Sequence, residues 1–174
     1  MKLQERNKPR TVLGVDPGSL KCGYGVVALQ GKETRHVASG TISPSSKKPL
    51  QERLKQIYDE LIQIIRTYKP DDIVVEKIFF SKGTKAALSL GHARGIVLLA
   101  AAAENIQLHE FSALQVKKAV VGYGRAEKGQ VASMVKVLLD VTGVLSTDSA
   151  DALALALCYL NTLQFNERLK INEK

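Results

Sequence analysis

Cysteine is scarce in this chain of 174 residues, which contains only Cys22 and Cys158. Two cysteines are too few for the disulfide framework on which small secreted proteins depend. The sequence also contains no CxxC pair and no cluster of cysteine and histidine with the spacing of a zinc site. A chain of this length buries about 70% of its unfolded surface. A single hydrophobic core can therefore stabilise it without disulfides or zinc.

Long apolar runs are missing as well. No stretch approaches the roughly 18 consecutive apolar residues of a membrane-spanning helix. The first residues, MKLQERNKPR, are polar and lack the apolar segment of a secretion signal. We expect residues 1–10 to form a flexible basic tail. The sequence predicts a cytoplasmic protein that does not associate with membranes.

Acidic residues are too few to balance the basic ones, and the imbalance is local. The net charge is +8, from 25 Lys and Arg against 17 Asp and Glu. Residues 77–136 hold nine Lys and Arg against three Glu, whereas residues 137–174 hold three against five acids. A basic region confined to one part of the chain is typical of phosphate binding. It serves solubility equally well, and charge alone does not separate these two interpretations.

The apolar pattern predicts three strands, followed by helices that alternate with strands. We expect strands at 11–16, 23–29, 36–43, 72–80 and 107–111, and helices at 50–68, 84–104, 112–121, 126–139 and 148–163. The short gaps between the first three strands indicate an antiparallel meander. The sequence therefore predicts an α/β protein with one five-stranded mixed sheet flanked by helices. We expect a single domain over residues 11–163 and a frayed tail over residues 164–174.

The stretch VLGVDPGS ends the first strand on a carboxylate, Asp16. Asp, Pro and Gly all favour turns, so a simple turn explains this stretch. The same residues would also place Asp16 at the rim of a sheet. Asp16 alone does not decide between the two interpretations.

Three further acids stand out by their surroundings. Glu76 lies inside IVVEKIF, an otherwise apolar strand, where an unpaired carboxylate is costly to bury. A salt bridge to a distant Arg is the alternative to a metal ion there. Asp148 and Asp151, in STDSADALALAL, are three residues apart and share one helix face. Acids are common in a first helical turn because of the helix dipole, which would explain one of them more readily than both.

The expected topology brings these four acids together. If the first strand is central, the strands that carry Asp16 and Glu76 are neighbours, and the last helix lies across them with Asp148 and Asp151. Carboxylates about 4 Å apart repel by about 1 kcal/mol in water and about 4 kcal/mol at an effective dielectric constant of 20. Divalent cations would offset this repulsion, and hard oxygen ligands favour Mg²⁺ or Mn²⁺. A pair of such ions supports hydrolysis of phosphodiester bonds.

An ordered series of motifs resembles the RuvC family of Holliday-junction resolvases. The matching segments are GVDPGS, GYGV, VVEKIFF, ALSLGHARG, QVKKAVVGYGRAEKGQV and DSADALALAL. They extend from about residue 12 to about residue 160. Any one of them would be weak evidence, since DPGS also resembles a phosphate-binding motif of actin-like ATPases. The ordered set is highly specific.

The resemblance implies a ribonuclease H-like fold and a homodimeric, Mg²⁺-dependent endonuclease, with Mn²⁺ as a substitute. Such an enzyme nicks two strands of like polarity in a four-way DNA junction symmetrically, in homologous recombination and DNA repair. A branch-migration motor complex is the expected partner. The implied catalytic and metal-binding residues are Asp16, Glu76, Asp148 and Asp151. Some relatives carry His in place of the last acid, so we interpret Asp151 as a metal ligand or a water-activating base.

The resemblance also implies a set of DNA contacts. In relatives the aromatic residue at Phe79 inserts between unstacked bases, although Phe79 and Phe80 could both be core residues. Aromatic–base stacking contributes about 1–3 kcal/mol per base. The candidate basic contacts are Lys82, Lys85, Arg94, Lys117, Lys118, Arg125 and Lys128. Lys117 and Lys128 are the strongest of these, whereas Lys85, Lys118 and Arg125 are equally consistent with an ordinary solvated surface.

The helix expected at 84–104 is rich in small residues. Gly91 and Gly95 each cost about 1 kcal/mol relative to Ala in a helix interior, which indicates close approach by another element. In relatives this helix lies at the dimer interface, and packing within the chain is the alternative. Two symmetric cuts require two active sites related by a two-fold axis.

Three other functions are compatible with parts of the sequence. A related ribonuclease H-like nuclease that acts on RNA shares the DPG start, but we do not expect it to carry VKKAVVGYGRAEK or the Phe pair. An actin-like ATPase needs two domains, for which 174 residues are too few. A DNA-binding protein without catalytic activity would have no need of four converging acids.

Overall fold

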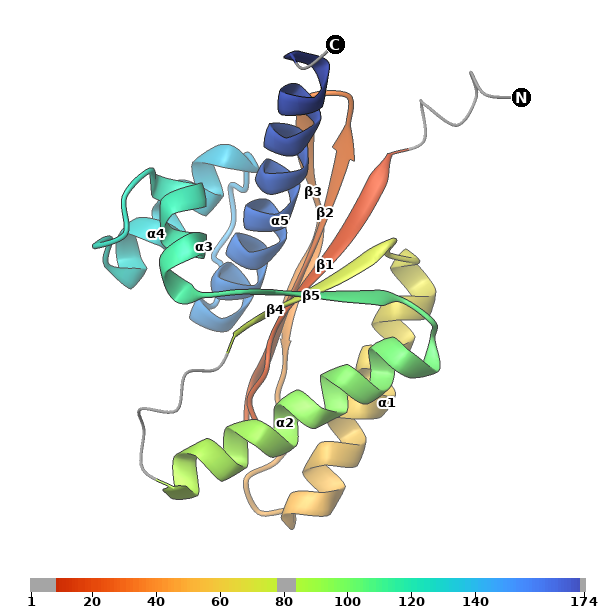
Figure 1. The fold of residues 1–174 in the computed structure, drawn as a ribbon. Helices are drawn as coiled ribbons and strands as arrows, with labels where there is room; N and C mark the ends of the chain where they lie inside the picture. Colours follow the sequence, from red (N-terminus) through yellow and green to blue (C-terminus); the bar gives the residue numbers. More distant parts are fainter. Residues whose placement is uncertain (1–8, 78–83, 173–174) are drawn as a thin grey trace.

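The protein folds around one open sheet. The computed structural model describes residues 9–77 and 84–172. The strands are β1 (Arg10–Asp16), β2 (Cys22–Gln30), β3 (Glu33–Ile42), β4 (Asp72–Glu76) and β5 (Gln107–Phe111). Their order across the five-stranded sheet is β3-β2-β1-β4-β5 (Figure 1). The first three strands pair antiparallel and β1, β4 and β5 pair parallel, which confirms the predicted mixed sheet.

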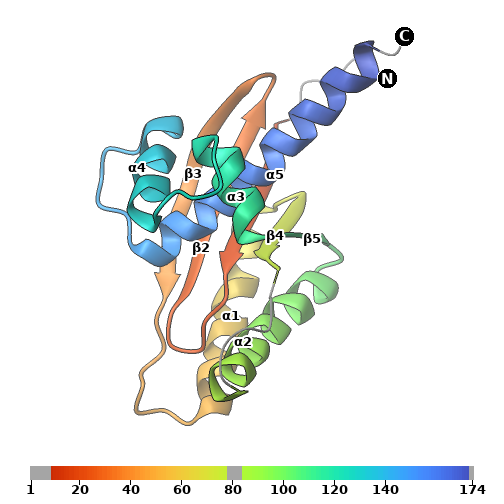
Figure 2. The same cartoon turned by 60° about the vertical axis from the view of Figure 1, so that its left-hand side comes forward.

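Helices cover both faces of this sheet. One face carries α1 (Leu50–Tyr68) and α2 (Thr84–Ala103), and the other carries α3 (Ala113–Val121), α4 (Lys128–Leu138) and α5 (Thr147–Asn172) (Figure 1). Helix α5 crosses β1 and β2, and its last turns project beyond the sheet (Figure 2). Residues 164–172, for which we expected a frayed tail, continue α5. This segment contains no Gly or Pro, so nothing in it ends the helix.

Alternation along the strands divides the core between the two faces. Val12 and Val74 belong to the cluster that packs against α5, whereas Leu13 and Ile73 belong to the cluster beneath α1 and α2. Side chains two residues apart on a strand share a face. Asp16 therefore lies on the α5 face with Val12, and Glu76 lies on the same face with Val74.

Glycine allows α5 to approach the sheet closely. A β-carbon on Gly14 would overlap the carbonyl oxygen of Ala152, and one on Gly23 would overlap the backbone of Asp148. The first turns of α5 thus rest directly on the backbones of β1 and β2. This contact fixes the height of the acids of α5 above the sheet.

Neither cysteine forms a disulfide, and each lies buried in a different core cluster. Within residues 9–77 and 84–172, no helix combines the length and the apolar character that are needed to cross a membrane.

Candidate active site

Asp16 and Glu76 lie side by side at the carboxyl ends of β1 and β4. The parallel register pairs Val15 with Val75, and each acid is the next residue along its strand. Glu76 is the last residue of β4 and is exposed, so its predicted place inside a buried strand was wrong. The apolar residues that follow Lys77 concealed the end of the strand in the sequence. The two carboxylates nevertheless occupy the expected common edge.

The first turn of α5 brings the other two acids to this edge. Ser146 caps the helix, since its Oγ accepts a hydrogen bond from the backbone N–H of Ser149 at 3.1 Å. The backbone of Asp148 lies against Gly23, which is paired with Asp16 in the sheet. Asp151 follows one turn later and lines the same cavity as Asp16 and Glu76. The structure therefore brings all four predicted acids to one end of the sheet.

A cavity opens between this edge and helices α3 and α4. Charged and apolar side chains line it together. The charged ones are Asp16, Glu76, Asp151, Lys117 and Lys128, and the apolar ones, referred to below as the apolar floor, are Ala113, Val116, Val131, Ala154 and Leu155. Asp148 is half-buried beside the cavity and does not line it. The apolar floor was not anticipated from the sequence, because these residues read only as ordinary helix core.

Asp16 is in an unfavourable electrostatic environment. Burial, together with the negative charges of Asp151, Glu76 and Asp148, raises the pKa of Asp16 from 3.8 to about 7. Lys128 opposes this shift. The cluster thus carries more negative charge than the protein itself compensates at neutral pH.

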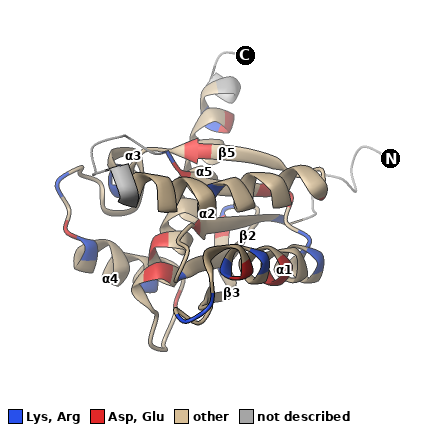
Figure 3. Ribbon diagram, turned by 90° about the horizontal axis from the view of Figure 1, so that it is seen from below, with Lys and Arg blue, Asp and Glu red and all other residues tan. Residues whose placement is uncertain are grey.

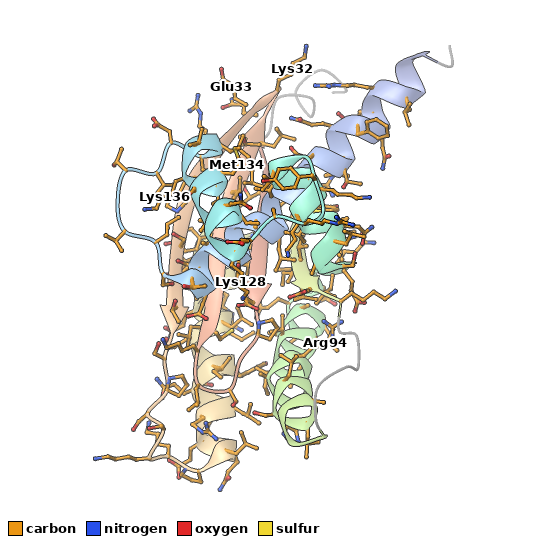
Figure 4. All side chains as sticks on the ribbon, turned by 90° about the vertical axis from the view of Figure 1, so that its left-hand side faces the viewer. Lys32, Glu33, Arg94, Lys128, Met134 and Lys136 are labelled. Atoms are coloured by element: carbon orange, nitrogen blue, oxygen red, sulfur yellow. The ribbon has the colours of Figure 1, made fainter. Side chains whose placement is uncertain are left out.

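Lys128 provides part of the missing positive charge. It is the first residue of α4, and its Nζ donates a hydrogen bond to Asp151 Oδ2 at 3.1 Å. This bond raises the pKa of Lys128. Figure 4 shows Lys128 at the start of α4 and Arg94 on α2, both seen from one side of the molecule. Among the described residues, no three acidic, His or Cys side chains are already arranged to hold a metal ion.

The other predicted DNA contacts differ in their placement. Lys117 lines the cavity together with Lys128. Lys118 and Arg125 are exposed on α3 and on the α3–α4 connection. Phe79 and Lys82 lie outside the described residues, as does the side chain of Lys85, so their roles stay predictions.

Arg94 has a different environment from that of a DNA contact. Its side chain is only 13% exposed and forms an ion pair with Glu110 of β5. Its Nη1 also donates a hydrogen bond to the main-chain oxygen of Glu76 at 2.8 Å. Nothing in the sequence pattern indicated that Glu110 would be its partner, because these residues meet only through the fold.

One further contact was missed at the sequence level. The Oγ atoms of Thr41 and Ser146 are 2.7 Å apart, which joins the end of β3 to the residue that caps α5. Neither residue belongs to a motif that would have identified this link.

The fold and the site together define a class of protein. An open mixed sheet with carboxylates from its central strand, the adjacent strand and a crossing helix is the arrangement of a ribonuclease H-like nuclease. A family model described as crossover junction endodeoxyribonuclease RuvC matches residues 12–159. The chain belongs to the RuvC family.

Individual relatives are similar over nearly their whole length. The crossover junction endodeoxyribonuclease RuvC of Citrifermentans bemidjiense is 45% identical over 159 residues, which cover 91% of this chain and 97% of the relative. That of Alkaliphilus oremlandii is 46% identical over 161 residues, with 92% and 98% covered. A solved structure of Thermus thermophilus RuvC in complex with a Holliday junction substrate is 31% identical. It has a TM-score of 0.84, with 90% of this chain and 96% of that chain covered.

Nucleases of this family depend on divalent metal ions. The donor set of this chain fits such an ion, because all four candidate ligands are carboxylates. The raised pKa of Asp16 supports the same conclusion, since it reports negative charge that a divalent cation would offset.

Proposed function

We propose that this chain is a Holliday-junction resolvase, a homodimeric endonuclease that nicks two strands of like polarity in a four-way DNA junction. One observation carries the proposal: Asp16, Glu76 and Asp151 open into the same cavity as Lys117 and Lys128. The acids suit metal-assisted hydrolysis, and the lysines suit the phosphate that is attacked. Membership of the RuvC family favours this function over an RNA-directed nuclease.

We assign Mg²⁺ as the ion, with Mn²⁺ as a substitute. Asp16, Glu76, Asp148 and Asp151 would hold it. A bound ion of this kind activates a water molecule and stabilises the leaving oxygen in phosphodiester hydrolysis. Lys117 and Lys128 bind the scissile phosphate and compensate charge that develops on it.

The deciding experiment compares three substrates in the presence of Mg²⁺. We expect cleavage of a synthetic four-way junction at symmetric positions, with little cleavage of linear duplex DNA or of an RNA–DNA hybrid. Preferred cleavage of the hybrid would favour the RNA-directed alternative. Equal cleavage of the linear duplex, or none of the junction, would contradict the proposed function.

The second copy needed for symmetric cleavage would dock on α2. Leu88, Leu98 and Leu99 of this helix are exposed, and β-carbons on Gly91 and Gly95 would meet no atom of the described chain within 4 Å. The α2 ribbon is largely uncharged, whereas α1 alternates basic and acidic residues (Figure 3). The close approach expected at these glycines is therefore not made by the described part of this chain, and a partner copy would supply it.

The docking surface is tested by light scattering on purified variants. We expect Leu99→Glu to convert a dimer into a monomer because it would bury a charge in the interface. Val137 on α4, which is 75% exposed, provides a matched control at Val137→Glu. A dimer that survives Leu99→Glu would place the interface elsewhere. The junction would be delivered by a branch-migration motor complex, and the enzyme would act in the cytoplasm.

A further inference from the structure

Arg94 is a charged residue that α2 directs toward the active-site edge of the sheet. Its guanidinium joins three elements, since Nη1 bonds the Glu76 main chain of β4 and Nη2 pairs with Glu110 of β5. Its side chain is 13% exposed, whereas Lys128 in the same region is 76% exposed. A DNA phosphate would have little access to a side chain buried to this degree.

The hydrogen bond from Arg94 to Glu76 lies at the point where β4 no longer pairs with β1. The register of β1 with β4 extends to Val15 and Val75, one residue before Glu76. On the other side, Glu76 is paired with Phe111, and Lys77 N–H donates to the Phe111 oxygen at 2.8 Å. Arg94 binds the carbonyl of the peptide that joins Glu76 to Lys77. That bond limits rotation of this peptide and so fixes the direction in which the Glu76 side chain leaves the strand.

Glu110 compensates the positive charge of Arg94 within the protein. Glu110 is 39% exposed and pairs with the Nη2 group, while the Nη1 group uses a neutral carbonyl. The planar guanidinium serves both acceptors at once, which a lysine ammonium on a flexible stem does less well. This arrangement orients the backbone of Glu76 through an interaction that does not itself occupy the carboxylate.

We propose that Arg94, held by Glu110, is a positioning residue that aims the carboxylate of Glu76 at the metal-binding cavity. The inference rests on the proposed function for the identity of the metal site, and it replaces the expected role of Arg94 as a DNA contact. Arg94 acts through Glu76 and does not touch the substrate.

The test measures metal affinity separately from catalysis. Binding of Mn²⁺ alone to the DNA-free protein is followed by electron paramagnetic resonance for the wild type, Arg94→Gln, Arg94→Lys and Glu110→Gln. We expect Arg94→Gln to weaken Mn²⁺ binding about tenfold, the usual effect of removing a group that orients a ligand. Arg94→Lys and Glu110→Gln each keep part of the arrangement, so we expect intermediate losses.

Junction binding distinguishes positioning from a DNA contact. We expect the junction Kd in Ca²⁺ and its salt dependence to be unchanged in Arg94→Gln. The kcat for cleavage should fall at low Mg²⁺, recover at saturating Mg²⁺, and leave the KM for the junction unaffected. A DNA contact would instead weaken Kd, lower the salt slope by about one unit, and leave Mn²⁺ affinity intact. That second pattern would overturn the proposal.

Arg66 provides the matched control. It forms an ion pair with Glu104 at 2.9 Å beyond the end of α2, away from the acids, and its side chain is 69% exposed. We expect Arg66→Gln to leave Mn²⁺ affinity unchanged. If Arg66→Gln lowered Mn²⁺ affinity as much as Arg94→Gln does, general destabilisation of the fold would explain both effects. If Arg94→Gln is not folded by circular dichroism, Glu110→Gln and Arg94→Lys decide the question. Failure of the wild type to cut a junction would contradict the proposed function, whereas Mn²⁺ affinities that are equal across folded variants would contradict the positioning role alone.

Discussion

The two ends of one sheet face hold acids in opposite circumstances. At the amino end, Asp72 is almost fully buried but is surrounded by partners. Arg10 Nε donates to its Oδ2 at 2.7 Å, and His109 Nε2 lies 3.0 Å from its Oδ1. Tyr159 extends this network by accepting a hydrogen bond from Arg10. At the carboxyl end, Asp16 is surrounded by three further acids.

The difference separates a structural acid, Asp72, from Asp16, which we propose to be functional. The surroundings of Asp72 satisfy its charge within the protein, as a stable fold requires of a buried carboxylate. The surroundings of Asp16 leave charge uncompensated, and the protein tolerates this cost where it has use for an ion and a phosphate. Burial alone would have ranked these two residues in the reverse order of functional interest.

The largest expected effect is on catalysis at the carboxyl end. Asp16→Asn should lower junction cleavage by about a thousandfold, because a metal ion contributes several kcal/mol of transition-state stabilisation. Junction binding in Ca²⁺ should persist, since the lysines are unchanged. Single-turnover cleavage and a gel-shift titration measure the two quantities. Loss of binding in parallel with cleavage would make Asp16 a structural residue like Asp72.

Substitution of Asp72, at the amino end, should destabilise the fold and leave catalysis largely unchanged. Asp72→Ala removes the acceptor of a partly buried ion pair. Loss of a partner from a fully buried pair costs about 3–5 kcal/mol. Arg10 is 45% exposed and keeps part of its hydration, so we expect the free energy of unfolding to fall by about 2 kcal/mol. Urea unfolding checks this, and cleavage at a temperature where the variant is folded should stay near the wild-type rate. A large loss of activity in the folded variant would show that Asp72 also contributes to catalysis.

The pH dependence of stability should also distinguish the two ends. The pKa of Asp16 is raised from 3.8 to about 7 in the folded chain, so the folded state binds more protons than the unfolded state in this interval. Without metal, the wild type should therefore lose stability relative to Asp16→Asn as pH rises from about 4 to about 7. Thermal unfolding in EDTA at pH 4 and pH 8 measures this difference. Addition of Mg²⁺ at pH 8 should stabilise the wild type more than Asp16→Asn, and equal stabilisation would remove Asp16 from the ligand set.

The smallest expected effect concerns the basic residues at the two ends of this sheet face. Lys117→Ala should lower the salt slope of junction binding by about one unit with little change in stability. Arg10→Ala, the control, should lower stability and leave the salt slope unchanged, because Arg10 is engaged by Asp72. The slope is read from Kd values between low and high salt. An unchanged slope in Lys117→Ala would remove Lys117 from the phosphate contacts.

The sequence predicted the strands of the mixed sheet and selected four acids for its edge, because the local pattern of residues indicated both. Alternating apolar residues located the strands, and a carboxylate directly after such a run marked the edge of the sheet. Glu76 was selected for a reason that did not hold, since the strand ends there and the residue is exposed. Apolar residues continue beyond the end of the strand, and periodicity does not show where pairing stops.

The side-chain partners of Arg94 and Asp72 were beyond prediction. The partners of Arg94 and Asp72 come from elements that only the sheet brings together, and no spacing in the chain encodes them. Arg94 was assigned to DNA because its charge belonged to a basic region. Charge composition does not distinguish a guanidinium that faces solvent from one that pairs with Glu110.

The position of α5 in the chain has a consequence for biosynthesis. Two of the four acids lie on this helix, which leaves the ribosome after the strands and the other helices described above. A nascent chain that ends before residue 147 carries Asp16 and Glu76 but lacks Asp148, Asp151 and the helix that covers one face of the sheet. Translation products that are interrupted there lack two of the four acids that we propose to be catalytic. The proposed active site can therefore assemble only after α5 has been synthesised.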